Sequence, residues 1–284
     1  MSSQPIVEAR DGRVVEVVLD DGYRLKYRTW SGPSPRATLF LLSGVMSHSA
    51  WFQPLAPHLT SGGMRVVAVD RRGSGECQAA RGDAPSPERL TEDLLAVVDR
   101  EHVAGRPLFI LGWCWGAVWA TNAALASGRD ISGLVLIAPG LFPSEEVCRR
   151  AHDGTHRAAG RPLDEACVTV PITEEMFTDG PWLEFIRADG LRLRRFTPRF
   201  ARILTKMGAI ARSRLDRLDL PILVVLARRD GAVDNAATRR AFEGRMHTTL
   251  VELDSQHGML FEVPEQLGLL VASWIADREG GDER

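Results

Sequence analysis

The stretch Pro107-Leu-Phe-Ile-Leu-Gly-Trp-Cys-Trp-Gly-Ala117 decides the fold, because an apolar run of strand length passes through two glycines directly into a helical pattern. Strand, tight turn and helix in this order form an elbow that presents the central side chain, here Cys114, at the helix N-terminus. Glycines are required on both sides because a Cβ would clash inside so tight a turn. Backbone N–H groups and the helix dipole favour an anion there, and therefore a thiolate. The stretch predicts a nucleophile at Cys114; the alternative is a buried structural cysteine between two glycines.

Two later strand ends supply the partners that a thiol nucleophile needs, a histidine base and an acid that orients it. In the strand–turn–helix architecture these follow in the order nucleophile, acid, histidine. The predicted strand 221–226 ends shortly before Asp230, and the predicted strand 248–253 ends shortly before His257. Order and placement therefore predict a triad of Cys114, Asp230 and His257.

The acid and the base each have an alternative assignment. Asp230 precedes Gly231 and also suits a turn, so Asp234 is a second candidate for the acid. Asp234-Asn235 is more typical of an N-cap that begins the next helix, which favours Asp230. His257 also suits an ordinary loop histidine, but no other histidine follows a late strand.

The chemistry also requires two backbone N–H donors for the oxyanion that forms on the attacked carbonyl. One is expected from Trp115, which directly follows the nucleophile. The other is expected from Val45, in the loop that follows the predicted strand 37–42.

Around the elbow, apolar runs of strand length alternate with amphipathic helical stretches, as in an α/β sandwich. Uninterrupted apolar runs suit strands that are buried on both faces of a parallel sheet. A Val-rich hairpin that turns at Asp21-Gly22 precedes them. The predicted strands span 13–19, 24–29, 37–42, 64–69, 107–111, 134–138, 221–226 and 248–253, and the predicted helices span 88–103, 115–126 and 265–276.

One segment, residues 141–218, breaks this alternation, because its apolar pattern is irregular, mostly helical and punctuated by prolines. We expect it to form a cap over the carboxyl edge of the strands, where ligands of open α/β sheets bind. The core would then comprise residues 1–140 and 219–284. The candidate pocket residues, all large and apolar, are Trp51, Met176, Phe177 and Trp182. A purely structural helix face explains those in the cap equally well.

Composition and charge exclude several classes of protein. A chain of 284 residues suits one α/β domain with an insertion. Its formal net charge of -2 argues against nucleic-acid binding, and the arginine-rich stretch 192–202 is interpreted as a solvated face. The first residues lack the pattern of a secretory signal, and no apolar run is long enough to cross a bilayer. A cytoplasmic location is therefore expected.

No metal and no cofactor are expected. The four cysteines have no CxxC spacing, and the i,i+4 pair His152 and His156 lacks a third ligand nearby. The glycine-rich turn 70–75 does not have the spacing of a phosphate-binding loop. A reducing compartment would keep a catalytic thiol free.

These motifs together resemble the α/β-hydrolase superfamily, in particular its lysophospholipase and monoacylglycerol lipase group. The resemblance is carried by the stretches 43–49, 70–75, 112–116, 185–191, 230–235 and 257–262. It implies a mostly parallel sheet flanked by helices, with a mainly helical cap inserted after the sixth strand, an acyl pocket under the cap, and no metal or cofactor. Two positions depart from the pattern: Cys114 replaces the nucleophilic serine, and Ser43 replaces the histidine before the oxyanion glycine. The elbow is also similar to the cysteine elbows of polyhydroxyalkanoate synthases, dienelactone hydrolases and some polyketide thioesterases.

A thiol nucleophile changes which acyl donors are favoured. A thiolate attacks thioesters and activated esters readily, and exchange between two thioesters is nearly isoenergetic. We therefore expect hydrolysis of an ester or thioester through an acyl-Cys114 intermediate, on a small-molecule acyl substrate that is free or bound to a carrier protein or coenzyme A. The alternatives are an acyltransferase with an alcohol or amine acceptor, a non-catalytic ligand-binding homologue, and a different reaction such as carbon–carbon bond hydrolysis or a lyase step.

Overall fold

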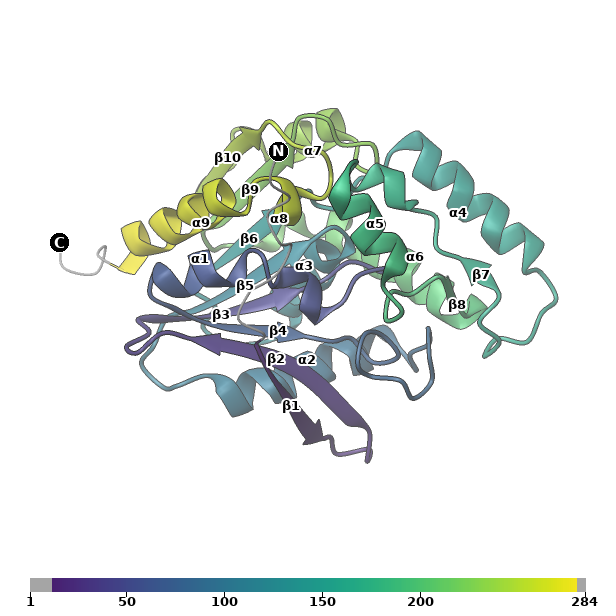
Figure 1. The fold of residues 1–284 in the computed structure, drawn as a ribbon, viewed down its shortest axis with the longest axis horizontal. Helices are drawn as coiled ribbons and strands as arrows, with labels where there is room; N and C mark the ends of the chain where they lie inside the picture. The colour runs from purple at the N-terminus through teal and green to yellow at the C-terminus, as the bar shows by residue number, and fades with distance from the viewer. Residues whose placement is uncertain (1–11, 280–284) are drawn as a thin grey trace.

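The computed structural model describes residues 12–279, so the N-terminal residues that lack a secretory pattern lie outside it. An eight-stranded sheet forms its centre, with the strand order β1-β2-β4-β3-β5-β6-β9-β10 (Figure 1). The strands of this sheet are β1 (Arg13–Val18), β2 (Arg24–Ser31), β3 (Ala37–Leu42), β4 (Met64–Val69), β5 (Leu108–Trp113), β6 (Gly133–Ile137), β9 (Ile222–Ala227) and β10 (Thr248–Leu253).

The sheet is mostly parallel, which confirms the predicted α/β class. β2 pairs in antiparallel fashion with β1 and β4, and the other neighbouring strands pair in parallel. Every residue of β3, β5, β6 and β9 is buried, as their uninterrupted apolar runs predict. At the edge, β1 alternates between exposed and partly buried residues because only one of its faces meets the core.

Helices cover the sheet on its faces and near its carboxyl edge. α1 packs against α9, and α2 packs against α3. α2 begins where the sequence supplies both start signals, since the hydroxyl of Ser86 accepts from the N–H of Arg89 and a proline takes the first helical position. These helices are α1 (Ala56–Ser61), α2 (Pro87–Glu101), α3 (Trp115–Ala126), α7 (Asn235–Phe242), α8 (Met259–Glu262) and α9 (Pro264–Glu279).

Between β6 and β9 the chain leaves the sheet, and residues 138–221 are called the inserted segment below. The segment is mainly helical and lies at one end of the molecule (Figure 1). It contains α4 (Glu145–Arg157), β7 (Val168–Thr169), α5 (Pro181–Ala188), β8 (Arg195–Phe196) and α6 (Pro198–Ser213). β7 and β8 form a separate two-stranded antiparallel sheet, which accounts for part of the irregular apolar pattern there.

The elements that differ from the prediction are short or lie at strand ends. β5 continues to Trp113, two residues beyond the predicted end, so the strand runs up to the nucleophile itself. The sequence pattern did not reveal α1 or α8, because helices of six and four residues make too few turns to show a period.

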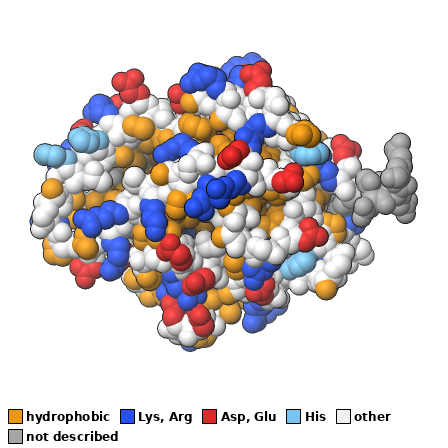
Figure 2. Space-filling model, turned by 180° about the vertical axis from the view of Figure 1, so that it is seen from behind, with side chains coloured by type: hydrophobic (Ala, Val, Ile, Leu, Met, Phe, Trp, Pro, Cys, Tyr) orange, Lys and Arg blue, Asp and Glu red, His pale blue; other side chains and the backbone are white. Residues whose placement is uncertain are grey.

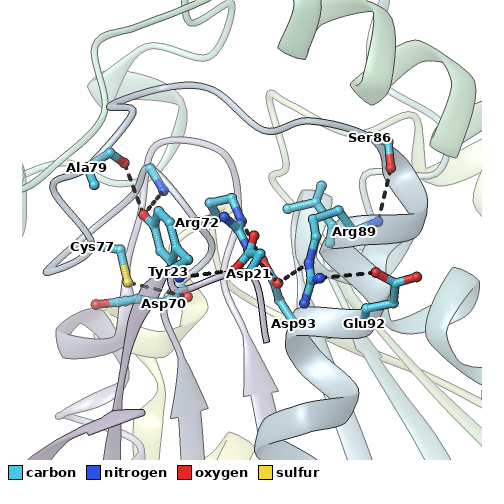
Figure 3. Close-up of polar contacts among 12 residues, drawn as sticks. Asp21, Tyr23, Asp70, Arg72, Cys77, Ala79, Ser86, Arg89, Glu92 and Asp93 are labelled. Carbon is cyan, nitrogen blue, oxygen red and sulfur yellow. Dashed lines mark hydrogen bonds and ion pairs between the residues drawn. The ribbon is translucent and has the colours of Figure 1, made fainter. Parts of the chain in front are cut away.

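A polar network fastens the hairpin of β1 and β2 to the glycine-rich turn 70–75 and to α2 (Figure 3). The fully buried carboxylate of Asp93 accepts two hydrogen bonds of 2.8 Å from Arg72 and one of 2.7 Å from Arg89. Arg72 also pairs with Asp21 and lies over the ring of Tyr23. Burial raises the pKa of Tyr23 to about 12, so its hydroxyl stays protonated and donates to the carbonyl of Ala79. The turn that follows β4 is thereby held against the core.

Candidate active site

Cys114 lies at the elbow between β5 and α3, in a conformation that few non-glycine residues adopt. Its φ of 59° and ψ of -127° are strained for an L-residue. A Cβ on Gly112 would lie 2.4 Å from the carbonyl oxygen of Gly116, and a Cβ on Gly116 would lie 2.0 Å from that of Leu42. Both glycines are thus required for the reason that the sequence suggested, and the geometry matches the predicted elbow.

His257 and Asp230 lie in the loops after β10 and β9, and the structure brings their side chains together. Nδ1 of His257 is 2.9 Å and 3.0 Å from the two carboxylate oxygens of Asp230, and both side chains are fully buried. Asp230 also accepts from the N–H groups of Ala232 and Val233, which fix its carboxylate in place. The indole of Trp113 donates to the carbonyl of His257 at 3.0 Å and holds the histidine loop against the elbow strand.

The ring of His257 is arranged to exchange a proton with the thiol. Asp230 occupies Nδ1, which leaves Nε2 free, and Nε2 has no hydrogen-bond partner of good geometry among residues 12–279. Burial by itself lowers the pKa of this imidazole, but the charge of Asp230 and the nearby Cys114 outweigh burial and raise the pKa to about 10. Both partners therefore favour the imidazolium form of His257, which is the form that accompanies a thiolate.

Asp234, the alternative acid, serves the next helix instead. Its carboxylate accepts from the N–H of Ala237 at 2.9 Å and caps α7, as the Asp234-Asn235 pattern indicates. Asp234 therefore caps a helix, whereas Asp230 contacts His257. Both observations favour Asp230 as the acid.

The predicted oxyanion donors lie on either side of the thiol. Trp115 is the first residue of α3, and the N–H of such a residue has no acceptor within the helix. The loop that carries Val45 passes so close that a Cβ on Gly44 would lie 3.1 Å from Sγ of Cys114. Ser43 donates its hydroxyl to the carbonyl of Ser47 and so braces this loop from within.

The inserted segment contacts the oxyanion loop through one carboxylate that sequence reasoning missed. Oδ2 of Asp189 accepts from Nε1 of Trp51 at 2.6 Å and lies 2.7 Å from Nε2 of His48. Burial raises the pKa of Asp189, but His48 and Trp51 outweigh burial and the pKa lies below its usual value. Next to this cluster, the N–H of Leu193 donates to the carbonyl of Met46. His48 and Asp189 stand 141 positions apart, and no pattern in the sequence connects them.

An apolar chamber of about 440 Å³ opens beside Cys114. Val45 and Trp115 line it at the nucleophile end, and one face each of α4 and α6 forms its walls. The wall residues are mostly apolar and include Val147 and Ala151 from α4 and Ala201, Leu204 and Gly208 from α6, with Thr155, Thr205 and Arg212 as polar members. The chamber therefore lies between the carboxyl edge of the sheet and the inserted segment.

None of the four candidate pocket residues from the sequence lines this chamber. They are Trp51, Met176, Phe177 and Trp182. Phe177 packs against the rings of Trp51, Trp113 and His257, and Trp182 stacks on Phe261. Large aromatic side chains bury most area against one another, so they form a cluster behind His257. Met176 lies next to Gly231, in the same region. Trp115, which was expected at the pocket, does line the chamber.

The described part of the chain holds no group of three or more His, Cys, Asp or Glu that could hold a metal ion, and the rings of His152 and His156 stack on each other. None of the helices within residues 12–279 combines the length and apolar character needed to span a bilayer. Several arginines of the stretch 192–202 are neutralised, since Arg192 pairs with Glu174 and Arg199 with Asp83. Figure 2 likewise shows basic and acidic side chains interspersed over one face.

Comparison with known proteins agrees with the geometry. The family model described as serine aminopeptidase, S33 matches residues 33–263. A monoacylglycerol lipase from Mycolicibacterium smegmatis is 26% identical over 273 residues, which cover 89% of this chain and 93% of that protein. Human monoglyceride lipase is 30% identical over 129 residues, covering 44% of this chain and 43% of that protein.

Solved structures share the fold of this protein over nearly all of its chain. A soluble variant of monoglyceride lipase from Saccharomyces cerevisiae, in complex with a substrate analog, has a TM-score of 0.84 at 15% identity and covers 97% of this chain and 99% of that chain. At that identity the likeness concerns the fold alone. Together with the sequence matches, it shows that this chain belongs to the serine aminopeptidase, S33 family and is an α/β-hydrolase of the monoacylglycerol-lipase-like branch.

Proposed function

We propose that this α/β-hydrolase cleaves an ester or thioester through an acyl-Cys114 intermediate. The observation that carries the proposal is a thiol at the elbow, beside an imidazole whose other nitrogen is held by a buried carboxylate, at the end of an apolar chamber. Nucleophile, base and orienting acid in this relation are the parts that covalent acyl transfer requires.

The reaction proceeds in two halves. The Cys114 thiolate attacks the carbonyl carbon, and a carbon–sulfur bond forms while the oxyanion accepts from the N–H groups of Val45 and Trp115. The bond to the leaving oxygen or sulfur then breaks, and the leaving group takes the proton from His257. In the second half His257 removes a proton from water, the hydroxide attacks the thioester, and the carboxylic acid leaves as the thiolate re-forms.

The chamber favours an acyl group with an apolar stem. Its volume of about 440 Å³ is within the range of pockets for small molecules, and its walls between α4 and α6 are mostly apolar. The inserted segment, in this proposal, is the cap that selects the acyl group. The relatives named as monoacylglycerol lipases suggest glycerol esters as one class, and the thiol adds thioesters of a carrier protein or coenzyme A as the second. A reducing compartment such as the cytoplasm would keep the thiol available.

Intact-protein mass spectrometry tests the proposal. Incubation with a panel of monoacylglycerols and acyl thioesters should add the acyl mass to the protein, and Cys114→Ala should abolish the adduct. Cys114→Ser asks whether sulfur is needed, and it should keep hydrolysis of oxygen esters better than that of thioesters. No adduct with any donor, together with full activity in Cys114→Ala, would overturn the proposal.

Burial of the site favours acyl transfer to a second substrate as the next candidate function. Cys114 is 2% exposed and His257 is 0% exposed, so an acyl-enzyme would be reached through the apolar chamber, where a bound alcohol or amine acceptor competes with water. An alcohol or amine that fits the chamber would then intercept the intermediate. Product analysis in the presence of graded acceptor separates the two functions, because transfer yields an ester or amide in place of free acid.

A further inference from the structure

A buried arginine near Trp115 has, among residues 12–279, no acceptor for its side-chain donors. Arg71 lies two residues after the end of β4 and is 2% exposed. None of its three side-chain nitrogens has a hydrogen-bond partner within residues 12–279. Its neighbour Arg72, by contrast, binds Asp93 through two hydrogen bonds. The mechanism proposed above gives Arg71 no task.

Arg71 lies near Trp115, a residue that lines the chamber and whose own indole donor is buried without a partner in the described chain. Its guanidinium carbon is 5.9 Å from the ring centroid of Trp115 and 4.6 Å from that of Phe200. Nε1 of Trp115 is buried and also lacks an acceptor in the described chain. Trp115 lines the chamber beside Cys114, and Phe200 packs against Phe196, which lines it too. Arg71 contributes three nitrogens and Trp115 one, and none of these four donors has an acceptor in the described chain.

The protein offers this guanidinium little compensation. The nearest acid in the chain, Asp70, directs its oxygens to the N–H groups of Ser49 and Glu76 instead. Burial, followed by the like charge of Arg81, lowers the pKa of Arg71 to about 10, so the side chain still carries its charge at neutral pH. Stacking on Phe200 favours the cation but satisfies none of its directional donors. Buried charges are normally paired, so an unpaired one calls for an explanation, and an anion bound from outside would supply the missing acceptors.

We propose that Arg71 and the indole N–H of Trp115 form a subsite for a carboxylate carried by the acyl group of the substrate. A carboxylate matches the fork of a guanidinium and accepts from an indole N–H as well. All four nitrogens are covered in this conformation, so the proposal includes a turn of the Trp115 ring that opens a path from the chamber to Arg71. The preferred donor is therefore a half-ester or half-thioester of a dicarboxylic acid, an assignment that rests on the proposed acyl-enzyme function.

The test compares matched acyl donors that differ in one carboxylate. We would measure kcat/KM for the succinyl and butyryl thioesters of the same neutral thiol, in the wild type and in Arg71→Met. The wild type should favour the succinyl donor, and Arg71→Met should lower its kcat/KM by about 10- to 100-fold, the range for a hydrogen-bonded charged group, with the butyryl donor unchanged. Because an unpaired buried charge is removed, the thermal midpoint of Arg71→Met should stay equal or rise.

A matched control is Arg28→Met. Arg28 is also buried, also has an unpartnered Nε, and lies on β2, which β4 and β3 separate from the elbow strand. Its substitution should leave the ratio of succinyl to butyryl kcat/KM at the wild-type value.

A second comparison places the negative charge on the leaving group instead of the acyl group. It measures kcat/KM for butyryl-pantetheine and butyryl-phosphopantetheine in the wild type and in Arg71→Met. Dependence on Arg71 in this comparison alone would overturn the acyl-side assignment. An unchanged succinyl to butyryl ratio in Arg71→Met, with or without a lower thermal midpoint, would overturn the subsite and leave Arg71 a structural residue. Failure of both donors to acylate Cys114 would instead remove the proposed function itself, so the two failures are distinguishable.

Discussion

The central strands and the inserted segment differ in how their residues are held. Every residue of β5 is buried, whereas α4 buries only Val147 and Gly154 and carries surface ion pairs such as that of Arg149 with Glu146. The nucleophile, the acid and the base all follow strands of the sheet, and the inserted segment supplies most of the chamber wall. The difference teaches that the proposed triad lies on the densely buried edge of the sheet, while the chamber wall, the proposed acyl site, lies on helices with a smaller buried face.

The largest expected effect comes from the sheet edge. Asp230→Asn should lower kcat by about 10⁴-fold, because an amide no longer holds His257 in the tautomer that accepts the thiol proton. Asp234→Ala is the contrasting change, and loss of the α7 cap should cost about 1 kcal/mol of unfolding free energy while most activity remains. Steady-state kinetics and urea denaturation check both, and a reversed order would transfer the acid role to Asp234.

The next effect should come from the contact between the two regions. Asp189→Asn removes the charge that His48 and Trp51 share, so the oxyanion loop loses its anchor in the inserted segment. We expect kcat to fall by about 10- to 100-fold with a smaller change in KM, as for loss of a charged hydrogen bond. Asp189→Glu should restore part of kcat.

Glu184→Gln is the control for Asp189→Asn, since its exposed carboxylate binds only Arg187 on the same helix. An equal loss of activity in that variant, or a change in KM alone for Asp189→Asn, would show that Asp189 does not position the oxyanion loop.

One pH-dependent contribution to stability should come from His257 at the sheet edge. The folded-state pKa of His257 is raised to about 10, above the value of about 6.5 for a free imidazole. The folded state therefore holds the proton more tightly, so this contribution is complete below about pH 6.5 and is lost as pH rises toward 10. The difference in unfolding free energy between wild type and His257→Gln should shrink from pH 7 to pH 10 in denaturant titrations. A difference that grows over this interval would contradict the raised pKa.

Within the inserted segment, the chamber wall should control the length of the acyl chain. Ala151→Phe fills space between α4 and α6, so kcat/KM for long acyl esters should fall by about 10-fold while short ones change less than about two-fold. His152→Phe places the same phenyl ring one residue further along, on the exposed side of α4, and should leave the chain-length profile unchanged. The same shift in both variants would argue against this chamber as the acyl site.

The smallest effect is expected on the surface of α4. Arg149→Ala removes ion pairs with Glu146 and Asp153, all on exposed side chains. The thermal midpoint should stay within about 1 °C of the wild type because solvent screens such pairs. A clear drop in differential scanning fluorimetry would mean that α4 depends on its surface charges.

The sequence by itself determined the fold class and the elbow, because both depend on interactions between residues that are close in the chain. Apolar runs that must be buried on both faces predict the parallel strands, and the glycines around Cys114 leave the chain one tight turn to make. The order of strand ends also predicted that Asp230 and His257 would lie together, because the carboxyl ends of parallel strands meet at one edge.

Only the tertiary structure decided which side chains face the substrate and which serve the core. Trp51 and Phe177 have the character of pocket residues, yet they pack against each other, and Phe177 packs against His257. The chamber is lined instead by residues such as Ala151 that no pattern singles out. The contact of Asp189 with His48 and the isolation of the Arg71 guanidinium depend on which distant segments pack together. Such neighbours are set by packing across the whole chain, whereas periodicity and turn chemistry report only on residues a few positions apart.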